Sequence, residues 1–242
     1  MKMKMMILVL LGIFLLSCSG FSSVSAASSA KKMTTKEVVE KILHTKLVPT
    51  YAEIEANSTG SGHTGMTIKA WDNTIKGQFR TEEKIGDTIS YSVSSGKKTI
   101  TYTKGENQAI EYNAGTTVSL NDAKPVLKEM QETTVLTFVG VEKLLNRSVY
   151  HLKGKGKTET ITINNRGQSD SFKHTYPDRE IWIDTKTGFV MKDTERDTRL
   201  SIERFKEVVK VDFAPKFSAA TFKLTLPKNV TIVNADDLKP KQ

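Results

Sequence analysis

The feature that most constrains this fold is a series of short segments in which apolar and polar residues alternate. From residue 51 to 112 they are rich in Thr, Ile, Tyr and Val and are separated by Gly, Asn and Asp. Alternation with period two predicts antiparallel strands with one buried face. The clearest strands are predicted at 66–71, 74–80, 88–93 and 99–103, with hairpin turns at 95–97 and 104–107.

The pattern resumes in the second half of the chain. Strands are predicted at 149–153, 158–163, 180–184 and 189–192, the last two joined by a tight turn at 185–188. Residues 200–213 fit two structures. Ile202, Phe205, Val208 and Val209 have helical spacing, but Val208, Val209 and Val211 also suit a strand. We favour a long, bulged strand.

Two helices are predicted beside these strands. The first begins at Thr34 or Thr35, with Glu37 in capping-box position, carries an apolar stripe to Leu47 and ends before Pro49. The second spans 122–132 and contains Val126, Leu127 and Met130. The expected fold class is therefore α+β and mostly β, with one large antiparallel sheet that curls because strand twist accumulates.

The N-terminus has the pattern of a signal peptide, assigned to residues 1–26. Lys2 and Lys4 precede an uncharged run from Met5 to Leu16, which is too short to span a bilayer. Leu15-Leu16-Ser17-Cys18 resembles a bacterial lipobox, so Cys18 is the predicted lipidation site. Val24-Ser25-Ala26 also fits ordinary signal peptidase, in which case Cys18 is discarded with the peptide. Lipidation is favoured.

Composition limits the partners. The chain has one cysteine, so a disulfide framework is excluded and stability must come from a buried core. The formal charge of +9, lowered by two if Lys2 and Lys4 are removed, favours anionic lipid or wall polymer over nucleic acid for an exported protein.

No enzyme motif is found. The four histidines, His44, His63, His151 and His174, have no metal-ligand spacing, and no G-x-S-x-G elbow is present. Gly154–Thr158 is predicted to be a basic turn, because the first glycine of a phosphate loop is missing. The mixed charges from Asp193 to Arg199 indicate a solvated strand or turn. Neither catalysis, nor a metal, nor a cofactor is expected.

Three segments resemble the LolA/LolB-type lipoprotein carriers and their relatives in spore-forming bacteria. The segments occur in the family's order and are Ser95–Tyr102, Ile181–Val190 and Ala219–Pro227, which match its "DGK…Y", "W-x-D-x-x-T-G" and "F-x-x-x-x-P" patterns. The resemblance implies an unclosed β-barrel with helices covering its concave mouth, and acyl chains or lipoproteins as ligands. It also implies cavity-lining positions at Val38, Ile42, Ile68, Phe79, Ile89, Tyr91, Tyr102, Val126 and Met130.

The sequence departs from the family pattern at one position. Residues 70–73 read Ala-Trp-Asp-Asn, without the arginine that closes the lid of the soluble carrier. We therefore expect a lipoprotein tethered outside the cell membrane, or a secreted or periplasmic protein if cleavage follows Ala26. The alternative is an interaction module for an envelope or spore-germination enzyme, such as a cell-wall amidase. The expected domains are a linker (27–33), the carrier-like body (34–233) and a polar tail (234–242).

Overall fold

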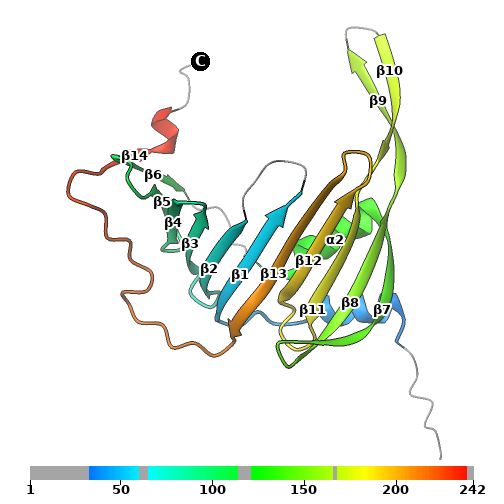
Figure 1. Cartoon of the computed structure of the whole chain (residues 1–242), viewed down its shortest axis with the longest axis horizontal. Helices are drawn as coiled ribbons and strands as arrows, with labels where there is room; N and C mark the ends of the chain where they lie inside the picture. Colours follow the sequence, from blue (N-terminus) through cyan, green and yellow to red (C-terminus); the bar gives the residue numbers. More distant parts are fainter. Residues whose placement is uncertain (1–32, 60–64, 114–120, 166–167, 239–242) are drawn as a thin grey trace, which may run out of the picture. The chain divides into compact units, whose positions relative to one another are not determined.

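The structure, a computed structural model, describes residues 33–59, 65–113, 121–165 and 168–238 (Figure 1). Its helices are α1 (Thr35–Leu43), α2 (Ala123–Thr133) and the short 3-10 helix η1 (Ala235–Leu238). The strands described are β1 (Thr50–Ser58), β2 (Met66–Asn73), β3 (Gln78–Ile85), β4 (Thr88–Ser94), β5 (Lys98–Thr103), β6 (Gln108–Asn113), β7 (Thr134–Leu144), β8 (Arg147–Gly156), β9 (Thr158–Asn165), β10 (Gln168–Thr175), β11 (Asp178–Asp184), β12 (Val190–Asp197), β13 (Ile202–Asp212) and β14 (Thr231–Asn234).

Twelve of these strands form one sheet in the order β14-β6-β5-β4-β3-β2-β1-β13-β12-β11-β8-β7. Neighbours are antiparallel except for β14, which adds to β6 in parallel. The end strands β7 and β14 are not paired with each other, so the sheet is unclosed. Figure 1 shows it curving, with β3–β6 turned relative to β11–β13. The predicted fold class is confirmed, with the parallel edge strand as an addition.

The helix α1 begins as predicted and ends early. Thr34 Oγ1 accepts from the Glu37 amide at 3.2 Å, and the Glu37 carboxylate accepts from the Thr34 amide at 2.8 Å, which completes a capping box. The expected extension to Leu47 is wrong. The amide and hydroxyl of Thr45 both donate to Ile42 O, which closes the last turn beyond Leu43.

The main hydrophobic core lies between the two helices and one part of the sheet. Its members are fully or almost fully buried and come from α1, α2, β8, β11 and β12: Val38, Val39, Ile42, Ala123, Leu127, Met130, Tyr150, Leu152, Ile181, Ile183 and Val190. This burial gives the helices their positions on the sheet.

The strand predictions differ from the structure at a few points. The expected strand 74–80 is wrong in its first half, because Gly77 has a φ of +61° and residues 74–77 form the turn between β2 and β3. The ambiguous segment 200–213 contains β13, whose pairing with β1 is bulged between Glu53 and Ile54. The strands β7, β10 and β14 were not predicted.

Candidate binding groove

One face of the sheet carries the helices, and cross-strand pairing shows which side chains share it. Ala56 pairs with both Lys206 and Met66, and Met66 pairs with Ile85, so these four side chains lie on one face. Lys206 Nζ donates to Asn121 Oδ1 at 2.7 Å, beside the start of α2. We call this the helix face of the sheet.

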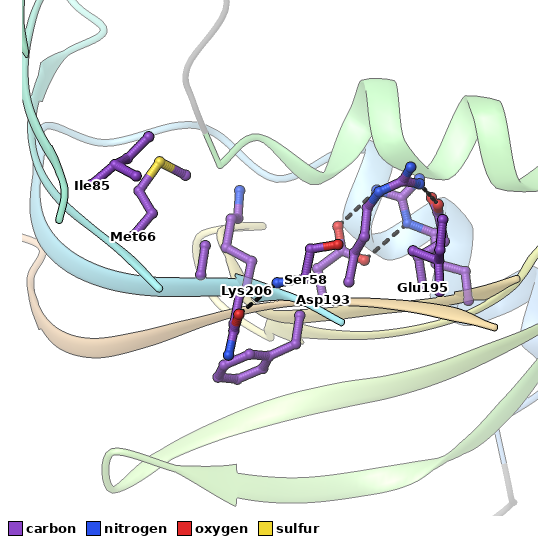
Figure 2. A pocket seen from close by; sticks show the side chains of 12 residues that line it. Ser58, Met66, Ile85, Asp193, Glu195 and Lys206 are labelled. Atoms are coloured by element: carbon purple, nitrogen blue, oxygen red, sulfur yellow. Dashed lines mark hydrogen bonds and ion pairs between the residues drawn. The ribbon is translucent and has the colours of Figure 1, made fainter. Parts of the chain in front are cut away.

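A groove of about 550 Å³ opens on the sheet where several strands end (Figure 2). Strands from both halves of the chain contribute to it, because β13 pairs with β1 at the centre of the sheet. Its lining residues are Ala56, Asn57, Ser58, Met66, Ile85, Arg179, Asp193, Glu195, Ile202, Arg204, Phe205 and Lys206.

Charged side chains form the floor of the groove. Asp193 accepts bidentate hydrogen bonds from Arg179, with Nε to Oδ1 at 2.9 Å and Nη2 to Oδ2 at 2.7 Å. Arg179 Nη1 also donates to Glu129 of α2 at 2.9 Å, which links the helix to the floor. Arg204 pairs with Glu195. Both arginines are therefore already matched by carboxylates.

Lys206 differs from these arginines. Its amino group contacts an amide oxygen, and no carboxylate of the described residues lies within ion-pair distance of it. Burial lowers the pKa of Lys206, with Arg179 adding to this effect and Asp193 opposing it. Figure 2 shows the side chain rising from the floor into the space between Met66 and Asp193.

The wall opposite the ionic pairs is apolar. Met66 at the start of β2 and Ile85 at the end of β3 are cross-strand neighbours, and Ile85 is 44% exposed. Ala56 and Ile202 add apolar surface nearby. The groove thus joins hydrocarbon surface to a partly buried amine, an arrangement that suits a ligand with both an apolar and a polar part.

Further along the helix face the sheet becomes hydroxyl-rich. Ser92 and Thr101 Oγ atoms are 3.0 Å apart, as are those of Ser90 and Thr103, and these rows pair across β4 and β5. The apolar surface available to a ligand is therefore concentrated near β1, β2 and β13.

The four helix positions predicted to line a cavity lie together. Val38, Ile42 and Met130 are members of the main core and Val126 packs against it. Their side chains fill the space between the helices and the sheet, and the groove of Figure 2 has other residues on its lining.

The five sheet positions are divided between two faces. Ile68 and Phe79 lie on the helix face, where Ile68 packs against a second core cluster. Tyr91 pairs with Tyr102, and both lie with Ile89 on the opposite face, because each is one residue out of step with the hydroxyl rows. None of the five lines the groove. Cys18 lies outside the described residues.

Sequence reasoning missed the groove residues. Asp193 belongs to the run of mixed charge interpreted as a solvated strand or turn, and neither Arg179 nor Lys206 was predicted as a site residue. The missed signal was that the charged residues of β13 occupy both faces of the strand, so one set had to share a face with the buried Val208.

The "W-x-D-x-x-T-G" segment forms a buried turn beneath the sheet. Asp184 is 1% exposed and accepts from Arg147 Nε at 2.6 Å, from the Thr187 hydroxyl and from the amides of Lys186 and Thr187. Gly188 has a φ of +68°, and an added Cβ would lie 2.1 Å from Thr45 Oγ1. The motif therefore joins β11 to the end of α1.

No group of His, Cys, Asp and Glu in the described ranges is placed to hold a metal ion. In the same ranges, no helix has the length and hydrophobicity needed to cross a membrane.

The described fold defines a class of proteins with an open, curved sheet covered by helices on one face. An uncharacterized conserved protein from Thermus thermophilus shares it, with a TM-score of 0.52 and 14% identity over 82% of this chain and 98% of that one. A chain of the Pseudomonas aeruginosa MucA/MucB complex matches with a TM-score of 0.50 and 11% identity, over 81% of this chain and 60% of the other. These likenesses concern the fold alone.

A more distant match is a LolA superfamily protein, NE2245 from Nitrosomonas europaea, with a TM-score of 0.32 and 8% identity over 80% of this chain and 99% of that one. A likeness at this score does not establish a common fold. No protein-family model matches the sequence, and no curated protein matches it significantly. The spore-protein part of the predicted resemblance has no support among these matches.

Proposed function

We propose that this protein is a non-enzymatic binding protein of the cell envelope whose groove holds the acyl chain of a lipid or lipoprotein. The observation that carries the proposal is the apolar wall of Met66 and Ile85 beside the partly buried amine of Lys206, in a groove of about 550 Å³. The volume suits a drug-sized or single-chain ligand. The body, residues 34–233, would present this groove outside the membrane.

Export and tethering belong to the same proposal. The basic start, the uncharged run and Cys18 support a lipid anchor at the outer face of the cell membrane. Mass spectrometry of the mature N-terminus checks this: an acylated Cys18 supports the tether, whereas a free Ala27 shows a secreted carrier.

The groove is tested with a fluorescent fatty acid and delipidated protein. Ile85→Asp places a charge on the apolar wall, so affinity should fall about tenfold or more, since a buried methylene contributes about 0.8 kcal/mol and an unpaired charge adds a further cost. The matched control is Ile75→Asp, in the β2–β3 turn at the other end of these strands, where the isoleucine is 78% exposed. Equal affinity in both variants would contradict binding in this groove.

A second candidate is docking of a partner protein on β7. This strand ends the sheet, and Val135, Val139 and Val141 on it are all more than 45% exposed. Exposed apolar residues on an edge strand are typical of an interaction site, where a partner can add an extended segment. The likeness to a chain from the MucA/MucB complex, which is a complex of two proteins, supports this hypothesis.

The edge is tested by Val139→Lys, which introduces a charge while leaving the buried face of β7 intact. A partner recovered by the unaltered protein from envelope extracts should be lost from this variant. It should be retained by Ile85→Asp if the edge, and not the groove, holds it.

A further inference from the structure

The groove contains an unusual combination of charges. Charged groups from the strand of Lys206 and from the neighbouring elements face its side chain. They are Arg204, Asp193, Glu195, Arg179 and Glu129. Each of the other five is held in an ion pair with another member of the set. Lys206 is the cation that this network leaves without a carboxylate among the described residues.

The position of Lys206 explains why a carboxylate does not reach it. Asp193 is its direct cross-strand partner on β12, but both Asp193 oxygens accept from Arg179. The Lys206 ammonium has three donor hydrogens, and Asn121 Oδ1 accepts one of them. Because the side chain stands in the groove (Figure 2), the remaining donor hydrogens can reach a ligand bound beside the apolar wall.

We propose that Lys206 binds the anionic head of the ligand, and that the groove selects single-chain amphiphiles ending in a carboxylate or similar small anion. The inference rests on the proposed function, because the same ligand places its chain against Met66 and Ile85. A charge-assisted hydrogen bond in a partly desolvated site is stronger than a neutral one. Because carboxylates already pair with Arg179 and Arg204, Lys206 is the cation of this cluster that is left for a ligand anion. A neutral head would leave the partly buried amine of Lys206 without an anion.

Protonation of Lys206 should make the binding of an anionic ligand depend on pH. A bound anion favours the charged form of Lys206, so binding raises a pKa that burial holds below the ordinary lysine value. Affinity for an anionic head should then fall as the pH rises through the pKa of Lys206 in the empty groove, because the lysine loses its proton there. Affinity for a neutral head should not change with pH through Lys206.

The experiment compares two probes with the same dansyl-labelled undecanoyl chain, one the free acid and the other its methyl ester. The unaltered protein should bind the acid about tenfold more tightly than the ester at pH 7. Lys206→Met should remove this preference and its pH dependence, while the ester binds as before. The matched control is Lys192→Met, because Lys192 is on the adjacent strand but stacks over Trp182 on the other face of the sheet.

The outcomes separate the two proposals. Equal binding of acid and ester by the unaltered protein overturns the anion inference and leaves acyl-chain binding standing. Absence of binding by either probe overturns both. If Lys206→Met shows a lower melting temperature, ester binding reports whether the groove is intact, and an unchanged acid preference in that variant overturns the role of Lys206.

Discussion

At the scale of single residues, Asp184 concentrates more polar contacts than any groove residue. Burial opposes ionisation of its carboxyl group, but the hydrogen bonds from Arg147 and Thr187 outweigh burial and hold the pKa of Asp184 below its ordinary value. Arg147 also lies over the ring of Phe213, 4.2 Å from its centroid. The turn thus ties β8, β11 and the segment after β13 together.

Asp184→Asn should lower the free energy of unfolding by about 2–3 kcal/mol, because it leaves Arg147 without its charged partner. The contribution of a carboxylate with a lowered pKa is present above the unfolded pKa of about 4 and is lost as the pH falls through the folded value. The difference between the two proteins in urea unfolding should therefore be full at pH 7 and shrink below pH 4.

Glu203→Gln is the matched control for that measurement. It removes one partner of the exposed Arg196–Glu203 pair and should cost less than about 1 kcal/mol at any pH. A pH-independent cost for Asp184→Asn would show that shape, and not charge, makes the contribution.

At the scale of elements, the hairpin of β9 and β10 stands apart. These strands pair with each other and with no strand of the large sheet. At the base of the hairpin the Tyr176 amide donates to Lys157 O at 2.9 Å, so the chain already closes there. Figure 1 shows the hairpin projecting beyond the ends of β8 and β11.

Replacing residues 158–175 with two glycines should change the free energy of unfolding by less than about 1 kcal/mol, because an isolated two-stranded hairpin is only marginally stable by itself. Leu152→Ala, on the adjoining strand β8 where Leu152 is fully buried, should cost about 2–5 kcal/mol. Urea unfolding of both variants checks this. A comparable loss in the deletion variant would show that the hairpin supports the sheet.

The elements also show how far local sequence reasoning reaches. The capping box at Thr34 and the turns at Gly96 and Gly105 were predictable, because each depends on residues a few positions apart. The strand β14 was not, because its parallel pairing with β6 depends on a contact between residues more than 100 positions apart.

At the scale of the whole molecule, the segment after β13 links the middle of the sheet to its edge strand β14. In this segment Thr221 O accepts a hydrogen bond from Arg80. The Arg80 side chain lies on the face of the sheet opposite the helix face. Phe222 is buried and packs edge-on against Phe217, with ring centroids 5.1 Å apart. The segment therefore has a small apolar contact of its own and is hydrogen-bonded to the face of the sheet opposite the helices.

Phe222→Ala should reduce the free energy of unfolding by about 3 kcal/mol, since it removes a buried ring from this contact. Phe172→Ala is the control: that ring, on β10, is 47% exposed and its loss should cost less than about 1 kcal/mol. Thermal unfolding distinguishes them. Equal shifts in melting temperature would mean that the segment does not stabilise the sheet.

The sequence by itself determined the fold class, because period-two alternation, caps and turns are local properties that leave few architectures open. Only the tertiary structure decided which face became the groove. Both faces of β4 and β5 carry partly buried side chains, so alternation could not tell inside from outside for Tyr91 and Tyr102. The groove likewise depends on β13 pairing with β1 and β12, which brings Lys206 beside Ala56 and Asp193 from distant parts of the chain.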